Sequence, residues 1–312
     1  MEYITLKKSD LKVSRLCMGG CPMGGYGWGQ TQESELIAAV QTAFDNGINF
    51  FDTADTYGFG QSELTLGKAL GSKRNNVIIA TKFGVRVGNG KTVYDNSPEW
   101  IRTALDSSLK RLDTDYIDLY QVHYRDGVTP ISIVVETLED LKKAGKIRYF
   151  GLSNLYENDM EELRSYAGKF TSFQDEYSLA CRKNEKDIKV LTESLEMTPM
   201  TWGSLGQGIL TGKYTKYNVN FGADDRRSRD IYVNFHGEKL IKNLKIVDEM
   251  KKIAAKHDKP VSAVAIRFIL DYLKNSVVLC GAKRPSQILA NIEGADWKLD
   301  EDDMKRLDEV SR

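Results

Sequence analysis

Histidine and cysteine are scarce in this sequence, and their scarcity excludes some kinds of site. The 312 residues include three histidines and four cysteines, and no C-x-x-C pair occurs. Of the histidines, only His123 lies in the first half of the chain. We therefore expect neither a disulfide framework nor a metal site. Cys17 and Cys280 fall in apolar runs and are interpreted as buried, reduced thiols.

An excess of charge of either sign is also missing. Lys and Arg together number 44, as do Asp and Glu, so the formal net charge is zero. Without a global basic field, the chain is not expected to bind nucleic acid or an anionic membrane surface. Residues 1–8 do not resemble a signal peptide, and no uncharged apolar run reaches transmembrane length. We expect a cytoplasmic protein that acts on a small molecule.

Eight short apolar runs alternate with amphipathic segments along the chain. Runs that are apolar almost throughout are typical of parallel strands buried on both faces. They cover residues 16–18, 48–51, 77–80, 116–122, 147–151, 170–173, 198–202 and 277–280.

Helical patterns lie between these runs. Apolar residues recur at helical spacing over 36–44, 101–109 and 134–141. Ser97 and Thr129 are each followed by proline, which predicts helix starts with an N-cap hydroxyl and proline at the first helical position.

Eight strand–helix units without a compositional break predict an α/β fold, a single (β/α)8 barrel over residues 1–312. The alternative, an open doubly wound sheet, usually carries G-x-G-x-x-G after its first strand. The glycines between Gly19 and Gly29 lack that spacing. One polar interruption, at about residues 215–237, is long for a loop in a compact domain, and we expect it to act as a lid.

Four ionisable side chains are expected to meet at one end of the barrel. Asp52, Lys82 and His123 end the second, third and fourth apolar runs, and Tyr57 follows in the loop after Asp52. Barrel enzymes carry their catalytic residues at the C-terminal ends of the strands. Any one of the four taken singly fits a cap, a solvated lysine or a packing residue. Together, on consecutive strands, they indicate an active site.

This set of residues suits reduction of a carbonyl, which needs a hydride at carbon and a proton at oxygen. A free tyrosine, with a pKa of about 10, is a poor acid at neutral pH. We expect Lys82 to lower the pKa of Tyr57, and Asp52 to hold Lys82 charged and in place. His123 is expected to orient the carbonyl oxygen. No side chain supplies a hydride, so a cofactor is required.

Several motifs resemble those of the aldo-keto reductases. Residues 52–63, Asp-Thr-Ala-Asp-Thr-Tyr-Gly-Phe-Gly-Gln-Ser-Glu, resemble the family signature. The other matching motifs are Thr81-Lys82, Gln121-Val122-His123, Gly151-Leu152-Ser153-Asn154 and residues 281–287. The resemblance covers essentially the whole chain. It implies an NADPH-dependent reductase of aldehydes or ketones, monomeric by default, with Asp52, Tyr57, Lys82 and His123 as catalytic residues.

The same resemblance implies where the coenzyme NADPH binds. Around the nicotinamide it implies Gly20, Cys21, Ser153, Asn154, Gln174 and Trp202. Along the pyrophosphate it implies Gly203, Ser204, Leu205 and Lys213. Around the adenosine phosphate it implies Gly281, Lys283, Arg284, Gln287 and Asn291, and the expected lid adds Arg226 and Arg227. The cations Lys283 and Arg284 suit a ribose 2′-phosphate, which favours NADPH over NADH.

Aromatic side chains are predicted to wall the substrate pocket, namely Tyr26, Trp28, Phe83 and Tyr124. Two other functions remain open. One is a coenzyme-binding sensor, like the potassium-channel β subunits that share this fold, although His123 stands where those subunits carry an amide residue. The other is a barrel lyase or isomerase that uses Lys82 as a Schiff base, in which Tyr57 would have no role.

Overall fold

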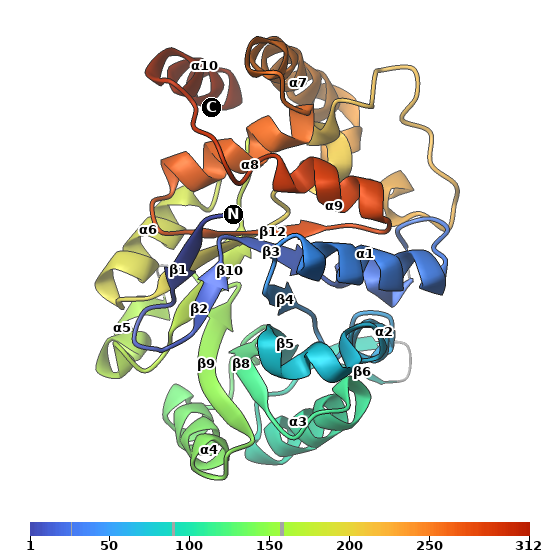
Figure 1. Ribbon diagram of the computed structural model, residues 1–312. Helices are drawn as coiled ribbons and strands as arrows, with labels where there is room; N and C mark the ends of the chain where they lie inside the picture. Colours follow the sequence, from blue (N-terminus) through green and yellow to red (C-terminus); the bar gives the residue numbers. More distant parts are fainter. Residues whose placement is uncertain (26, 89–90, 157–158) are drawn as a thin grey trace.

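Eight parallel strands close into a barrel in the computed structural model, which describes residues 1–25, 27–88, 91–156 and 159–312 (Figure 1). In their order around the barrel, the strands are β10 (Ser172–Glu176), β11 (Thr198–Trp202), β12 (Val277–Gly281), β3 (Leu16–Gly19), β4 (Phe50–Asp52), β5 (Ile78–Phe83), β8 (Ile117–Val122) and β9 (Ile147–Ser153). Each of the eight apolar runs overlaps one of these strands. The predicted (β/α)8 fold is confirmed.

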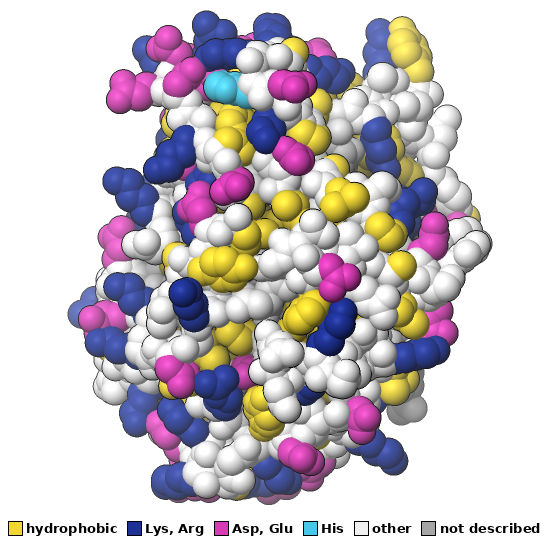
Figure 2. Space-filling view, in the orientation of Figure 1, with side chains coloured by type: hydrophobic (Ala, Val, Ile, Leu, Met, Phe, Trp, Pro, Cys, Tyr) yellow, Lys and Arg dark blue, Asp and Glu magenta, His cyan; other side chains and the backbone are white. Residues whose placement is uncertain are grey.

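Helices surround the barrel, and the last ones along the chain form a second layer on one side (Figure 1). They are α1 (Glu33–Asp45), α2 (Gln61–Leu70), α3 (Pro98–Leu112), α4 (Ile131–Lys143), α5 (Met160–Leu163), α6 (Glu185–Ser194), α7 (Gly237–His257), α8 (Val261–Tyr272), α9 (Pro285–Ile292) and α10 (Glu301–Ser311). On the face in Figure 2, basic and acidic side chains are interspersed, as expected from the balanced composition. Among the described residues, no helix is long and apolar enough to cross a membrane.

The two sides of each barrel strand belong to different apolar layers, because successive side chains point in opposite directions. In β5, Ile78 and Ala80 join the layer inside the barrel, whereas Ile79 and Phe83 join the layer under the helices. The Lys82 side chain, two residues after Ala80, points to the same inner side of the strand. Phe83 is fully buried against Tyr120, with ring centroids 4.7 Å apart. The prediction that Phe83 walls the substrate pocket is therefore wrong.

A hairpin that the sequence analysis did not predict closes the N-terminal end of the barrel. Strands β1 (Tyr3–Thr5) and β2 (Lys12–Ser14) pair antiparallel and lie in front of the barrel in Figure 1. Leu6, Leu11 and Val13 pack onto the inner layer. Because the hairpin covers the N-terminal end, a site is expected at the opposite end, which holds the C-terminal ends of the strands.

The two predicted helix starts had different outcomes. Ser97 caps α3 as expected, and its Oγ accepts a hydrogen bond from the Trp100 amide at 3.3 Å. The Thr129 prediction is wrong, because α4 begins at Ile131 and the Ile131 amide donates to Glu162 Oε1 at 2.8 Å. The Thr129 hydroxyl donates instead to a neighbouring aspartate in its own turn.

Two irregular additions extend the C-terminal end of the barrel. After β5 the chain forms a second hairpin, from β6 (Val85–Gly88) and β7 (Lys91–Tyr94). After β11 come the 3-10 turns η5 (Gly206–Thr211), η6 (Arg226–Ser228) and η7 (Val233–Phe235), which lead into α7. The expected lid, at about 215–237, falls within this second addition.

Candidate active site

The four predicted catalytic side chains meet at the C-terminal end of the barrel. Lys82 Nζ lies 2.6 Å from Asp52 Oδ1 and 3.5 Å from Tyr57 Oη, and it donates to the Thr53 carbonyl at 2.8 Å. The rings of Tyr57 and His123 are nearly perpendicular, at 84°, with centroids 6.0 Å apart. Three adjacent strands, β4, β5 and β8, therefore bring an ion pair, a phenol and an imidazole to one place.

The Asp52–Lys82 pair is buried but fully provided with hydrogen-bond partners. Asp52 Oδ2 accepts from Gln121 Nε2 at 3.1 Å and from Gln174 Nε2 at 2.9 Å. A buried ion pair is tolerated when such additional partners replace water. The role of Gln121 was not predicted, although its position two residues before His123 puts it on the same side of β8.

Tyr57 and His123, the two groups beside the Asp52–Lys82 ion pair, are both uncharged. Burial raises the pKa of Tyr57 well above its usual range, and Cys21 and Asp52 add to the shift. The pKa of Tyr57 is thus raised overall and not lowered as expected, because burial deprives a phenolate of water and outweighs the charge of Lys82. Burial lowers the pKa of His123 well below its usual range, and the positive charge of Lys82 adds to this.

A cavity of about 660 Å³ opens beside these residues, and Asp52, Tyr57 and His123 line it. The predicted coenzyme-binding residues all line it as well, with the exception of Arg284. Arg284 is exposed at the N-cap position of α9. Of the predicted substrate-pocket residues, Trp28 and Tyr124 line the cavity. Tyr26 lies outside the described residues.

An aromatic wall at the inner end of the cavity is held by hydrogen bonds. Trp202 ends β11, and its Nε1 donates to Asn154 Oδ1 at 3.1 Å. Asn154 Nδ2 in turn donates to the backbone carbonyl of His123 at 3.0 Å. The position of the indole is therefore linked to the strand that carries the imidazole. A fixed flat ring next to amide groups suits a bound nicotinamide, which has a flat ring and a carboxamide.

Basic side chains gather at the outer end of the cavity, where Lys213, Arg226, Arg227 and Lys283 line it. Arg227 is tied to Asp225, with its Nε 2.9 Å from Oδ1. Burial lowers the pKa of Lys283, and Arg227 contributes to this shift. The positive field at this end suits phosphate groups.

The segment after η5 reaches across the cavity to the loop after β3. The Arg226 amide donates to the Gly27 carbonyl at 3.0 Å, and the Arg226 guanidinium lies 5.4 Å from the Trp28 ring centroid. Tyr232 packs edge-on against Trp28, with centroids 6.3 Å apart. Gly27 has a φ of 74°, and a Cβ there would lie 2.5 Å from Arg226 Nε. Glycine is therefore required at position 27, where the segment carrying Arg226 contacts the loop after β3.

A family comparison decides what this arrangement is. The model of the Aldo/keto reductase family matches residues 15–312. The chain belongs to the aldo/keto reductase family. The predicted family resemblance is thereby confirmed, and the family in general comprises oxidoreductases that use nicotinamide coenzymes.

Known members of the aldo/keto reductase family match this chain over nearly their full length. The aldo-keto reductase YhdN of Bacillus subtilis is 36% identical over 99% of this chain and 93% of its own. The NADH-specific methylglyoxal reductase of Escherichia coli is 30% identical over 100% of this chain and 98% of its own. The solved structure of a glycerol dehydrogenase from Gluconobacter oxydans is 35% identical, with a TM-score of 0.89 over 99% of this chain and 94% of that one.

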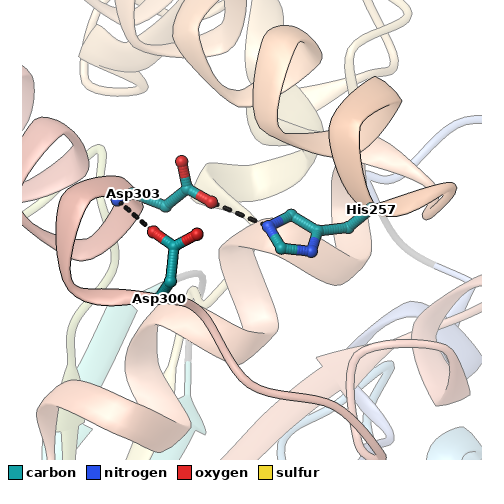
Figure 3. Close-up of side chains that lie close together, drawn as sticks. All are labelled: His257, Asp300 and Asp303. Carbon is teal, nitrogen blue, oxygen red and sulfur yellow. Dashed lines mark hydrogen bonds and ion pairs between the residues drawn. The ribbon is translucent and has the colours of Figure 1, made fainter.

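One further cluster of this aldo/keto reductase has the residue types of a metal site (Figure 3). His257 ends α7, and its Nε2 lies 2.7 Å from Asp303 Oδ2. Asp300 caps α10 by accepting from the Asp303 amide at 2.9 Å. The Lys256 ammonium pairs with both carboxylates. Since a cation already occupies the cluster, we interpret it as a helix cap that docks α10 on α7.

Proposed function

We propose that this protein reduces an aldehyde or ketone to an alcohol with hydride from NADPH, and that Tyr57 donates the proton to the carbonyl oxygen. The observation that carries the proposal is the pairing of a protonated phenol with a neutral imidazole on one cavity wall. Behind them lies the buried Asp52–Lys82 ion pair.

The bound nicotinamide would supply the hydride, and the residues of the inner cavity fit it. Trp202 offers the flat face, and Ser153, Asn154 and Gln174 offer polar atoms to its carboxamide. His123 and Tyr57 hold the carbonyl oxygen between a ring nitrogen and a hydroxyl. This positioning favours one orientation of the carbonyl carbon toward the coenzyme.

Proton donation uses the charges behind Tyr57. Hydride addition makes the carbonyl oxygen basic, and an alkoxide is a stronger base than a phenolate. Tyr57 can therefore give up its proton at that moment even though burial keeps it protonated otherwise. Lys82 Nζ, 3.5 Å from Tyr57 Oη, stabilises the phenolate that is left. Asp52 keeps that ammonium charged and directed at Tyr57.

The choice of NADPH rests on the basic outer end of the cavity. Four basic side chains, Lys213, Arg226, Arg227 and Lys283, line this end, so positive charge is in excess there. Burial is the main cause of the lowered pKa of Lys283, and the charge of Arg227 adds to it. A ribose 2′-phosphate placed there would relieve this excess, whereas the ribose hydroxyl of NADH would not. We further propose that residues 1–312 act as one barrel domain, and that about 215–237 closes over the coenzyme as a lid.

The test is turnover by the wild-type protein on a panel of aldehydes, ketones and keto sugars, with NADPH and NADH compared. We expect consumption of NADPH, with a lower KM than for NADH. Tight NADPH binding without turnover of any carbonyl would support the sensor function instead. Trapping of a covalent adduct on Lys82 by borohydride would support the Schiff-base enzyme.

A further inference from the structure

The Gln121 side chain is held inside the barrel, next to the Asp52–Lys82 ion pair. Gln121 lies on β8, is fully buried, and is the partner of Lys82 of β5 in the strand register. On its other side it is the partner of Gly151 of β9, which carries no side chain. One neighbouring strand therefore places the lysine beside the amide, and the other leaves room for the amide.

Each end of the Gln121 amide has a partner of its own. Nε2 donates to Asp52 Oδ2 at 3.1 Å, and Oε1 accepts from Gln174 Nε2 at 3.3 Å. A flipped amide would turn its oxygen toward the carboxylate and its nitrogen toward the Gln174 nitrogen, so only one orientation satisfies both partners. Gln174 Nε2 also donates to Asp52 Oδ2, at 2.9 Å. Two amides thus hold Oδ2, and Oδ1 is left for Lys82.

Filling the barrel does not require an amide at this position. Leu119, two residues earlier on the same side of β8, belongs to the inner apolar layer together with Ala80 and Phe50. A buried amide costs free energy unless its polar atoms are paired, whereas an apolar side chain of similar size has no such need. The amide of Gln121 is therefore explained by its action on Asp52.

We infer that Gln121 is a positioning residue for the proton transfer from Tyr57. By fixing the Asp52 carboxylate, it keeps the Lys82 ammonium directed at the phenol. The inference rests on the proposed function, because it acts on the group that donates the proton. Lys82 Nζ lies 2.6 Å from Asp52 Oδ1 and 3.5 Å from Tyr57 Oη. A carboxylate that could rotate would draw the ammonium with it, and the phenolate left after proton donation would lose the stabilising positive charge.

The first experiment measures single turnovers of Gln121→Met, which keeps the approximate size of the side chain and removes both polar ends. We expect NADPH oxidation at saturating aldehyde to be about tenfold slower than in wild type. The solvent deuterium isotope effect should increase, because proton transfer becomes the slower part of the step. The Kd for NADPH should change less than about threefold. A rate within about twofold of wild type would overturn the inference.

Asn184→Leu is the matched control for Gln121→Met. Asn184 is also a buried amide, and its Nδ2 donates to the buried Asp175 carboxylate at 3.1 Å. This pair lies outside the Asp52–Lys82 network, so the substitution also removes a hydrogen bond to a buried carboxylate. We expect its turnover rate and its isotope effect to remain those of wild type.

A second variant, Gln121→Glu, separates positioning from a merely structural role. Its new carboxyl donates a hydrogen bond to Asp52 while it is protonated, and repels Asp52 once it is ionised. Nearby Cys17 and His123 stay neutral, because burial raises the pKa of the thiol and lowers that of the imidazole. We expect the rate relative to wild type to be close to one at about pH 6 and to fall about fivefold by about pH 8. A relative rate equally low at both pH values would overturn the inference, even if Gln121→Met failed to fold.

A measurement without substrate keeps this inference separate from the proposed function. The Lys82 ammonium is 1% exposed and donates to Asp52 and to the Thr53 carbonyl, so its protons should exchange slowly with water. NMR of protein with isotopically labelled lysine would measure this exchange. We expect faster exchange in Gln121→Met but not in Asn184→Leu, and an unchanged rate in Gln121→Met would overturn the inference. If wild type reduced no carbonyl, the proposed function would fail, and the exchange rates would still decide whether Gln121 positions the ion pair.

Discussion

The catalytic corner and the outer wall of the same cavity are built in different ways. The corner, meaning Asp52, Tyr57, Lys82 and His123, is carried by strand ends and one short loop, and its ion pair is almost completely buried. The outer wall, meaning residues 213–236 and 281–291, consists mainly of loops, 3-10 turns and one short helix. Under the proposed function, the strand ends thus carry the catalytic groups, whereas loops and turns carry most of the groups for the coenzyme phosphates.

This difference predicts unequal effects of substitution. A group in the corner has no water to replace a lost partner, so its removal should be costly. A group in the outer wall is partly exposed, and solvent can substitute for it. The four substitutions below run from the largest expected effect to the smallest.

Tyr57→Phe should lower kcat for carbonyl reduction by about three orders of magnitude, because it removes the proton donor while keeping the ring. NADPH binding, followed by fluorescence titration, should change little. Tyr120→Phe is the matched control, because Tyr120 is also buried and its hydroxyl donates to the Ile101 carbonyl at 3.3 Å, away from the ion pair. A Tyr57→Phe variant with a kcat close to that of wild type would show that Tyr57 is not the proton donor.

Lys82→Met should destabilise the fold by about 3–5 kcal/mol, because it leaves the buried Asp52 carboxylate without a counter-charge. Denaturant unfolding would measure this loss. The double variant Lys82→Met/Asp52→Asn removes both charges and should recover most of the stability but none of the activity. A single variant as stable as wild type would mean that water reaches Asp52, contrary to the description of a closed corner.

Asp55→Asn should change how stability depends on pH. Burial raises the pKa of Asp55 to about 8, and Glu63 adds to the shift. Above the ordinary aspartate pKa, the unfolded chain loses a proton that the native chain retains up to about pH 8, so wild-type stability should fall across that window. Asp55→Asn should therefore gain stability relative to wild type as the pH rises from about 4 to about 8, and should be similar to it at about pH 4. Parallel pH profiles of unfolding would contradict the raised pKa.

Lys283→Ala should raise the KM for NADPH about tenfold and leave the KM for NADH nearly unchanged. Arg284→Ala provides the contrast, since Arg284 is exposed and does not line the cavity. Its effect on the NADPH KM should be less than about threefold. If Arg284→Ala had the larger effect, the outer wall would bind the 2′-phosphate in a different place from the one proposed.

The corner was predictable because its residues follow apolar runs. Buried parallel strands are apolar along nearly their whole length, so the residue that ends each run marks the C-terminal end of a strand. Asp52, Lys82 and His123 were located in this way. The same alternation of side chains excludes Phe83 from the substrate pocket and places Gln121 on the inner side of its strand, because inward and outward positions differ by one residue.

The remaining features depend on contacts between segments that are far apart in sequence. The cap of α4 comes from Glu162, whose distance of 31 residues from Ile131 gives no local signal. The contact of Arg226 with Gly27 joins two irregular loops in the same way. The raised pKa of Tyr57 depends on how completely the fold removes water, which a motif does not reveal.

The most direct test of the proposed chemistry follows the hydride itself. The coenzyme would be labelled with deuterium at the transferable position of its nicotinamide, and the alcohol product analysed by mass spectrometry. We expect one deuterium on the carbinol carbon with wild type and almost no product with Tyr57→Phe. Two results would contradict hydride transfer at this corner. One is alcohol without deuterium, whichever face of the nicotinamide carried the label. The other is no alcohol at saturating coenzyme.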